Sequence, residues 1–209
     1  MEKEAKESAS GKALSIGAVV MASGVARRFG SNKLLADLAG KPVIQHTLAA
    51  LPLDAVEPVV VTRSMDVARL MIELDVPYYL NVLPYQSDTV RIGLAAGEER
   101  WDGCLFVTAD QPLLTQASVR AMLDAFGQHP DRVVRLAWKG QAHNPVLFPR
   151  RLFRRLRALE GDVGGSQILR NDPDLASRTI LVEAVSKAEV MDIDTPADLE
   201  RIERIVEGR

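Results

Sequence analysis

"IGAVVMASGVARRFGSNK", residues 16–33, decides the fold, because a run of apolar residues gives way to a short stretch of small and basic ones. Residues 16–22 are almost all apolar, as in a strand that is buried on both faces of a parallel sheet. Ala22, Ser23 and Gly24 follow, and their small side chains let backbone N–H groups approach an anion closely. The stretch therefore predicts a buried strand that ends in an anion-binding loop.

Two basic side chains of the same loop strengthen this prediction. Arg28 can hold two phosphate oxygens at once, and Lys33 adds a compact positive charge. The spacing of Gly24, Gly30 and Lys33 fits neither the Walker loop nor the G-x-G-x-x-G dinucleotide loop. From the residues alone, an ordinary surface turn with solvated Arg28 and Lys33 is the alternative.

Apolar runs at residues 57–63 and 103–109 also predict buried strands, and they alternate with stretches of helical spacing at 67–74 and 119–126. Thr115 is a candidate N-cap for the second of these helices. This alternation predicts an α/β fold, a Rossmann-like three-layer sandwich with a mostly parallel, twisted sheet. Further strands are expected at 132–138, 144–149, 178–184 and 188–194, and further helices at 150–160 and 195–208.

The last helix has clear signals at its start. Thr195 is expected to cap it, and Pro196 suits its first position. Leu199, Ile202 and Val206 recur at helical spacing and are expected to face inward.

The chain has 209 residues and a net charge of −2, with a pI near 6.0. We expect one domain over residues 16–209, preceded by a disordered lead-in at 1–15. The balanced charge argues against duplex nucleic acid or an anionic membrane as the main partner, and no apolar run approaches the ~20 residues of a membrane-spanning helix. The single cysteine, Cys104, lies in an apolar run, which indicates a buried side chain and a reducing, cytoplasmic compartment.

Acidic side chains follow or end two of the predicted strands. Asp110 follows residues 103–109, at the edge where open α/β sheets bind ligands, and a turn former or helix cap is the alternative. Asp192 and Asp194 would point to one face if residues 190–194 form a strand, and a strand end followed by a helix cap is the alternative. Since Mg²⁺ prefers one or two carboxylates together with phosphates and waters, these side chains are candidate metal ligands.

The loop resembles the signature L-A-A-G-x-S-x-R-x-G-x-x-K of MobA-like nucleoside-triphosphate transferases, in which it holds the triphosphate. Gly24, Arg28 and Lys33 are in register with this signature. Ser23 stands in place of its second alanine, and Ala26 in place of its serine. The loop residues that the resemblance places against the nucleotide are Ala22, Ser23, Gly24, Arg28 and Lys33.

Two acidic motifs extend the resemblance. "ADQP", residues 109–112, is similar to the family's G-D-x-P, which implies that Asp110 binds the catalytic Mg²⁺. "DIDTPADL", residues 192–199, matches the closing motif of molybdenum cofactor cytidylyltransferases, and implies that Asp192 or Asp194 is a second metal or substrate contact. The catalytic residues implied by the resemblance are Arg28, Lys33 and Asp110.

"YQSDTVRIGL", residues 85–94, resembles the family's Q-S-x-S-L-R-x-G-L segment, which lies near the nucleotide base. The resemblance implies that Gln86, Ser87 and Thr89 contact the nucleotide, because their short side chains offer hydrogen-bond donors and acceptors. A role for Ser87 as a helix N-cap is the alternative.

Residues 140–169 resemble the acceptor half of the cytidylyltransferases. Asn144 stands where that family commonly has histidine, and Ser166 stands where it often has arginine. The acceptor contacts implied are His143, Asn144 and Asp162. The basic cluster at 150–157 is interpreted as a solvated helix face.

Together the motifs imply a nucleotide-diphospho-sugar transferase type of fold and a molybdenum cofactor cytidylyltransferase. Such an enzyme joins CTP to the molybdopterin cofactor and releases pyrophosphate, by Mg²⁺-assisted attack of a phosphate on the α-phosphate. A phosphate monoester is mostly dianionic at neutral pH, so the reaction needs positioning and charge neutralisation rather than a general base. The alternatives are CMP or GMP transfer to another phosphorylated acceptor, such as a sugar phosphate, and a cofactor carrier for a molybdenum hydroxylase.

Overall fold

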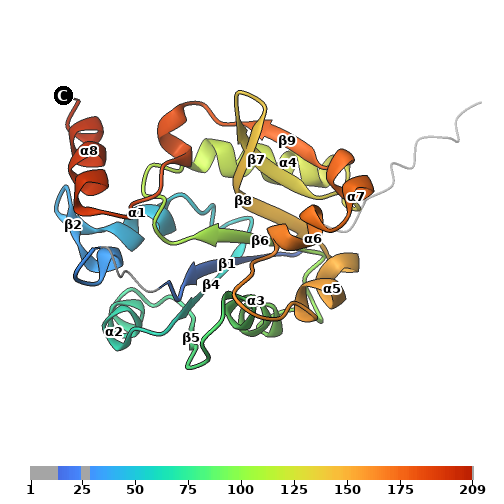
Figure 1. The fold of residues 1–209 in the computed structure, drawn as a ribbon, viewed down its shortest axis with the longest axis horizontal. Coiled ribbons are helices and arrows are strands. Elements are labelled where there is room, and N and C mark those ends of the chain that lie inside the picture. The colour runs from blue at the N-terminus through green and yellow to red at the C-terminus, as the bar shows by residue number, and fades with distance from the viewer. Residues whose placement is uncertain (1–13, 25–28, 209) are drawn as a thin grey trace, which may run out of the picture.

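The computed structural model describes residues 14–24 and 29–208, so the predictions for residues 1–13, for Ala26 and for Arg28 lie outside the described part of the chain. A seven-stranded sheet forms the centre of this part (Figure 1). Its strands are β1 (Ile16–Ala22), β4 (Glu57–Thr62), β5 (Tyr78–Leu80), β6 (Gly103–Thr108), β7 (Val134–Trp138), β8 (Gln141–Pro149) and β9 (Ile180–Glu183). A small antiparallel pair, β2 (Asp37–Leu38) and β3 (Lys41–Pro42), is separate from this sheet.

The strand order is β5-β4-β1-β6-β8-β7-β9. Of these seven strands, β8 runs against both of its neighbours, and every other neighbouring pair is parallel. The predicted mostly parallel sheet is therefore confirmed. Because β8 is reversed and Val146 pairs with Phe106, the first residues of β8 lie beside the carboxyl end of β6.

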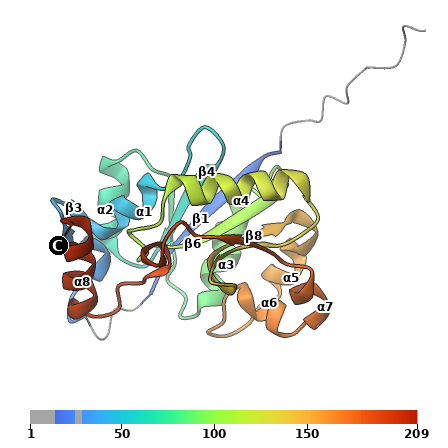
Figure 2. The same cartoon turned by 90° about the horizontal axis from the view of Figure 1, so that it is seen from above.

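Helices cover both faces of the sheet (Figure 2). One face carries α1 (Val43–Ala49), α2 (Met65–Glu73) and α4 (Gln116–Gln128), and the other carries α3 (Gln86–Ala95), α5 (Phe153–Arg157), α6 (Ser166–Arg170) and α7 (Pro173–Ser177). The last helix, α8 (Pro196–Val206), packs with the β2–β3 pair, and short 3₁₀ helices occur at Lys33–Leu35, Arg150–Leu152 and Lys187–Val190. None of the helices in residues 14–24 and 29–208 is long and apolar enough to cross a membrane.

The central strands β1 and β6 are buried on both faces, which explains their continuous apolar runs. Val19 and Phe106, opposite each other on β1 and β6, pack into the core under α3. Their neighbours Val20 and Val107 pack into the core under α4. Cys104 is fully buried in the first of these cores, so the prediction of a buried side chain is confirmed, and this burial raises the pKa of its thiol.

The predicted helix caps are also confirmed. Thr115 and Thr195 each accept a hydrogen bond from the backbone N–H three residues later, at the starts of α4 and α8. Ile202 is fully buried and Leu199 packs against the same cluster, as expected. Val206 is 40% exposed, so the prediction that it faces inward is wrong. It is the last residue of α8, where the helix has passed the surface that it covers.

The predicted strand at 188–194 is wrong. The segment forms the 3₁₀ helix Lys187–Val190 and then runs on without strand pairing. Glu189 is 1% exposed, and its carboxylate accepts hydrogen bonds from Thr115 Oγ1 and from the backbone N–H of Val185. These bonds satisfy the buried carboxylate of Glu189 and hold the chain in a turn instead of a strand.

The chain is attached to the sheet from Ser15 onward, a residue that the sequence placed in the lead-in. Ser15 N donates to Asp102 Oδ2 at 3.0 Å, and Asp102 N donates to Ser15 O at 2.7 Å. These two bonds hold the start of β1 next to the start of β6.

Helix α3 lies very close to β1, and a glycine permits this approach. A Cβ added at Gly93 would lie 2.4 Å from Val19 Cγ1, inside van der Waals contact. The close approach matters for the site, because α3 begins at Gln86, over the carboxyl ends of the strands.

We predict that Gly93→Ala lowers the free energy of unfolding by about 1–3 kcal/mol, because the added methyl group must push α3 away from β1. Gly127→Ala, in α4, is the matched control. No atom lies within 4 Å of its added Cβ, and alanine favours helix, so stability should rise by about 0.5–1 kcal/mol. Urea unfolding followed by circular dichroism measures both. Equal effects of the two substitutions would contradict the close packing of α3.

Candidate active site

The site lies where three neighbouring parallel strands end. Strands β1, β4 and β6 are adjacent and parallel, so their carboxyl ends meet at one edge of the sheet. Ser23 and Gly24 follow β1, Arg63 follows β4, and Asp110 lies just beyond β6. Ligands of open α/β sheets bind at this edge, as the sequence predicts for this chain.

Hydrogen bonds to β4 and to the residues that follow it fix both described ends of the basic loop. Ser23 Oγ donates to Val61 O at 3.1 Å, which turns its hydroxyl toward the sheet. On the far side of the loop, Asn32 Nδ2 donates to Ser64 Oγ at 2.9 Å, and Ser64 in turn caps α2. Ser23 and Asn32 are therefore both anchored, and Lys33 follows directly after the second of these anchors.

Asp110 is placed by its backbone neighbours. Ala109 N donates to Met21 O at 3.2 Å and Ala109 O accepts from Thr47 Oγ1 at 3.1 Å, so both of its backbone groups are paired. The carbonyl of Asp110 accepts from Ile193 N at 3.0 Å. This last bond brings the segment that carries Asp192 and Asp194 to the end of β6.

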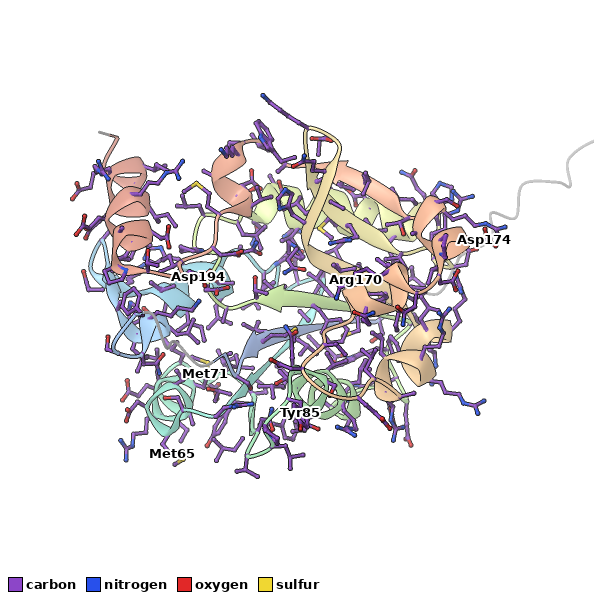
Figure 3. The ribbon with its side chains drawn as sticks, viewed as in Figure 1. Met65, Met71, Tyr85, Arg170, Asp174 and Asp194 are labelled. Carbon is purple, nitrogen blue, oxygen red and sulfur yellow. The ribbon has the colours of Figure 1, made fainter. Side chains whose placement is uncertain are left out.

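Lys33 joins the two acidic segments. Its Nζ lies 2.6 Å from Asp110 Oδ2 and 3.1 Å from Asp194 Oδ1, and its side chain is only 12% exposed. Burial by itself lowers the pKa of Lys33, but the charges and hydrogen bonds of Asp110 and Asp194 outweigh burial and raise it. Lys33 is therefore a positively charged ammonium held between two carboxylates. Figure 3 labels Asp194, which lies beyond the carboxyl end of β6.

Asp192 is the third carboxylate of this cluster. It does not lie on a strand, so the expectation that a strand points it to the same face as Asp194 is wrong. It lines an open cavity and keeps exposed surface there, yet the protein around it removes part of its hydration. This loss of hydration, reinforced by the charges of Asp110 and Asp194, raises the pKa of Asp192 to about 6.

The carboxylate cluster brings three acidic side chains close together. Lys33 pairs with Asp110 and Asp194, and the charges of these two carboxylates add to the loss of hydration in raising the pKa of Asp192. Carboxylate oxygens are the ligands that Mg²⁺ and Mn²⁺ prefer, so the donor set fits a divalent cation. In the described part of the chain, no three His, Cys, Asp or Glu side chains are grouped closely enough to enclose a metal as they stand. Lys33 occupies the space between two of the candidate ligands.

A cleft of about 590 Å³ opens next to this cluster. The residues predicted from sequence that line it are Ser23, Gly24, Gln86, Thr89, Asp110 and Asp162. Ala22 and Ser87 are buried and are not among its described lining residues. Ser87 is the second residue of α3, so its alternative role as N-cap is wrong. The cap position is Tyr85, whose backbone N–H donates to Asp88.

The cleft continues into two further cavities along the sheet edge. A cavity of about 210 Å³ shares Met21, Gln86 and Thr108 with the first cleft. A third, of about 600 Å³, shares Asn144 and Arg170 with the second. The three cavities together form one groove.

The predicted acceptor residues divide between the ends of this groove. His143 and Asn144, at the start of β8, line the third cavity. Asp162 lies instead in the first cleft, where its Oδ1 accepts from Gln86 N at 3.3 Å. The structure thus brings Asp162 together with the residues expected at the nucleotide.

Several residues of the groove have no counterpart in the sequence prediction. Arg63 lines the first cleft, and Thr108 lies between the first two cavities with its buried hydroxyl unpaired within the described residues. Arg135 and Arg170 line the third cavity. Arg63 and Thr108 lie at strand ends, which was a usable signal. Arg135 lies within a strand, and nothing in its spacing marks it.

Comparison with known proteins agrees with this geometry. Residues 18–178 match the MobA-like NTP transferase domain. The chain belongs to this family. It is therefore a nucleotidyltransferase with the family's α/β fold, and the matched residues contain the basic loop and Asp110 but end before Asp192 and Asp194.

Relatives of this MobA-like transferase bear different names. It is 26% identical over 200 residues to the purine catabolism protein PucB of Bacillus subtilis. That alignment covers 89% of this chain and 95% of PucB. It is 35% identical over 119 residues to 3-deoxy-manno-octulosonate cytidylyltransferase of Methylococcus capsulatus, covering 53% of this chain and 46% of that enzyme. A probable molybdenum cofactor guanylyltransferase of Bacillus cereus is 28% identical over 118 residues, covering 56% and 59%. The chain thus spans nearly all of PucB and about half of the other two.

Solved structures show the same fold. A nucleotidyl transferase from Methanothermobacter thermautotroptrophicus superposes with a TM-score of 0.77 at 26% identity, over 93% of this chain and 99% of that one. Rv0371C of Mycobacterium tuberculosis in complex with manganese gives a TM-score of 0.72 at 23% identity, over 91% and 98%. The fold class predicted from sequence is confirmed by both.

The raised pKa of Asp192 predicts how the metal-free protein responds to pH. Its carboxyl is more easily protonated in the folded than in the unfolded state, so the protein loses stability as the pH rises from the ordinary aspartate pKa of about 4 to about 6. Asp192→Asn should therefore raise Tm by a few degrees at about pH 8, and by much less at about pH 3, where Asp192 is neutral in both the folded and the unfolded state. Differential scanning calorimetry in EDTA measures this. Asp124→Asn, on the exposed face of α4, should change Tm little at either pH, and a pH-independent effect of Asp192→Asn would contradict the crowded carboxylate cluster.

Proposed function

We propose that this MobA-like transferase is a molybdenum cofactor cytidylyltransferase, which transfers CMP from CTP to the phosphate of the molybdopterin cofactor and releases pyrophosphate. The observation that carries the proposal is the junction of Lys33, Asp110 and Asp194 next to the groove: Asp110 lines its nucleotide-sized cleft, and the neighbouring Asp192 lines the cavity that contains Arg135 and Arg170. A transferase needs such an arrangement, because donor and acceptor must meet at one reacting phosphorus atom.

The donor nucleotide fits the first cleft. Ser23 and Gly24 begin the loop, and the small side chains there leave the backbone N–H groups accessible to phosphate oxygens. Lys33, after the loop, and Arg63, opposite it, bring positive charge toward the triphosphate. Gln86 and Thr89 on α3 lie where the ribose or base of the nucleotide would contact the protein, although the hydroxyl of Thr89 already accepts from Asn81 Nδ2 at 2.9 Å.

The reaction forms one bond and breaks one bond at the α-phosphorus. An oxygen of the acceptor phosphate attacks the α-phosphorus, the bond to the β-phosphate oxygen breaks, and pyrophosphate leaves with the bonding electrons. The acceptor phosphate is mostly dianionic at neutral pH, so no base has to remove a proton. The chain's own residues therefore align the two phosphates and neutralise their charge.

Asp110, together with Asp192 or Asp194, would hold the divalent cation, which supplies charge neutralisation at the triphosphate when bound. Lys33 has a second role in this arrangement. Its ammonium keeps Asp110 and Asp194 side by side, and it can turn toward the phosphates once a cation takes its place at the carboxylates. The manganese complex of Rv0371C supports a divalent cation in this fold, and Mg²⁺ remains our expectation from the sequence motif.

CTP and molybdopterin are supported by two observations. The motif of residues 192–199 is nearly identical to that of molybdenum cofactor cytidylyltransferases, and one relative is named as a molybdenum cofactor guanylyltransferase. The second candidate is CMP transfer to a sugar acceptor. It is favoured by the 35% identity to 3-deoxy-manno-octulosonate cytidylyltransferase.

The test is pyrophosphate release by the purified protein with Mg²⁺ and molybdopterin cofactor, comparing CTP, GTP, ATP and UTP. We expect pyrophosphate release with CTP. Asp110→Asn should lower the rate of this release on the order of 100-fold or more, and the control Asp124→Asn should keep the full rate. Nucleotide binding without release would favour another acceptor or a cofactor carrier. Release with GTP alone would contradict the cytidylyl assignment, and full activity of Asp110→Asn would contradict the role of the carboxylate cluster.

A further inference from the structure

The third cavity, of about 600 Å³, contains two arginines from different elements. Arg135 is the second residue of β7, and Arg170 is the last residue of α6 (Figure 3 labels Arg170). His143 and Asn144, near the start of β8, line the same cavity, and Asn144 and Arg170 also line the second cavity. Asp192 lines the third cavity as well, which places the two arginines at the acceptor end of the groove.

Neither arginine is neutralised. Within the described residues, no carboxylate lies within ion-pair distance of Arg135 or Arg170. Arg135 donates two long bonds of 3.3 Å to the carbonyl of His143, and Arg170 donates to Oε1 of Gln167 at 2.8 and 3.1 Å. Both partners are uncharged. Each guanidinium has five N–H donors, so most of them remain available to a ligand.

The two charges are also close enough to affect each other. Burial lowers the pKa of Arg135, and the positive charge of Arg170 lowers it further. Arg135 is half-buried and Arg170 is exposed, so an anion bound between the two guanidiniums would relieve the repulsion that acts on the less hydrated Arg135. In the same protein, other exposed arginines such as Arg155 and Arg157 are paired with carboxylates.

The position of Arg170 explains a departure in the sequence. Ser166 stands where the cytidylyltransferase motif often has arginine, and both Ser166 and Arg170 line the cavity. They are four residues apart on α6, so they lie on one face, one turn from each other. Arg170 thus brings a guanidinium to the cavity that Ser166 also lines.

We propose that Arg135 and Arg170 together bind the phosphate of the acceptor, so that the acceptor of this enzyme is a phosphate monoester rather than a compound that attacks through a hydroxyl group. Two guanidiniums from separate elements suit a phosphate, whose three terminal oxygens point in different directions. The two coplanar oxygens of a carboxylate are satisfied by one guanidinium. The inference rests on the proposed function, and it selects among acceptors. The two arginines are positioning residues that neutralise and orient the attacking group.

The probe is phenyl phosphate, with benzoate and phenol as the carboxylate and uncharged comparisons. Binding is measured by isothermal titration calorimetry in the presence of Mg²⁺ and a CTP analogue with a methylene group between the α- and β-phosphorus atoms, which fills the triphosphate site. We expect phenyl phosphate to bind and the other two compounds to bind at least about tenfold more weakly. Arg135→Met and Arg170→Met should each weaken phenyl phosphate binding on the order of tenfold, leave the affinity for the CTP analogue unchanged, and raise the acceptor KM rather than the CTP KM.

Arg178→Met, an exposed arginine that does not line the cavity, is the matched control, and Arg135→Lys should recover part of the affinity. Circular dichroism and Tm show that each variant is folded. Unchanged phenyl phosphate binding in both methionine variants, equal binding of benzoate, or no binding of phenyl phosphate to the unmodified protein would overturn the inference. If the CTP analogue fails to bind, the proposed function fails. If phenyl phosphate still binds in that case, and binding is lost in the two methionine variants, the arginines form an anion site. The claim that this site holds the acceptor would then be overturned.

Discussion

The ion pairs of Lys33 with Asp110 and Asp194 join three parts of the chain that are far apart in sequence. Lys33 ends the basic loop after β1, Asp110 follows β6, and Asp194 precedes α8. The surrounding hydrogen bonds serve the same junction: Thr47 fixes Ala109, and Ile193 fixes the carbonyl of Asp110. The Ile193 backbone bond and the packing of Ile193 with Leu38 and Val43 bring the acidic segment to the end of β6, and the ion pairs then join it to Lys33.

The reversed strand β8 has the second large effect on the site. In a sheet of parallel strands, the start of each strand lies far from the carboxyl edge. Because β8 runs against β6, His143 and Asn144 near its start reach that edge and line the third cavity. In the proposed function the donor would bind in the first cleft and the acceptor in the third cavity, so the two halves of the groove would meet at the carboxyl end of β6. Transfer between two bound phosphates needs this meeting of the two halves.

The sequence predicted much of this fold and site, and its failures have physical reasons. Buried strands at 16–22, 57–63 and 103–109, the caps Thr115 and Thr195, and the strand-end position of Asp110 were all predictable, because each depends on a local pattern. The strand expected at 188–194 was not formed, since the buried carboxylate of Glu189 bonds to Thr115, 74 positions earlier in the chain. The position of Asp162 in the first cleft beside Gln86 had no local signal, and Arg135 was not considered. Their neighbours are set by the tertiary fold, which no local spacing reveals.

The central claim is that Asp110 and Asp194 form a cation site that Lys33 occupies when no metal is bound. Titration of Mn²⁺ without nucleotide, followed by electron paramagnetic resonance, tests it most directly in the unmodified protein, Lys33→Met and Asp110→Asn. The account predicts that Lys33→Met binds Mn²⁺ more tightly than the unmodified protein, because the competing ammonium is gone, and that Asp110→Asn binds it more weakly. Equal Mn²⁺ affinity in all three proteins would contradict the account.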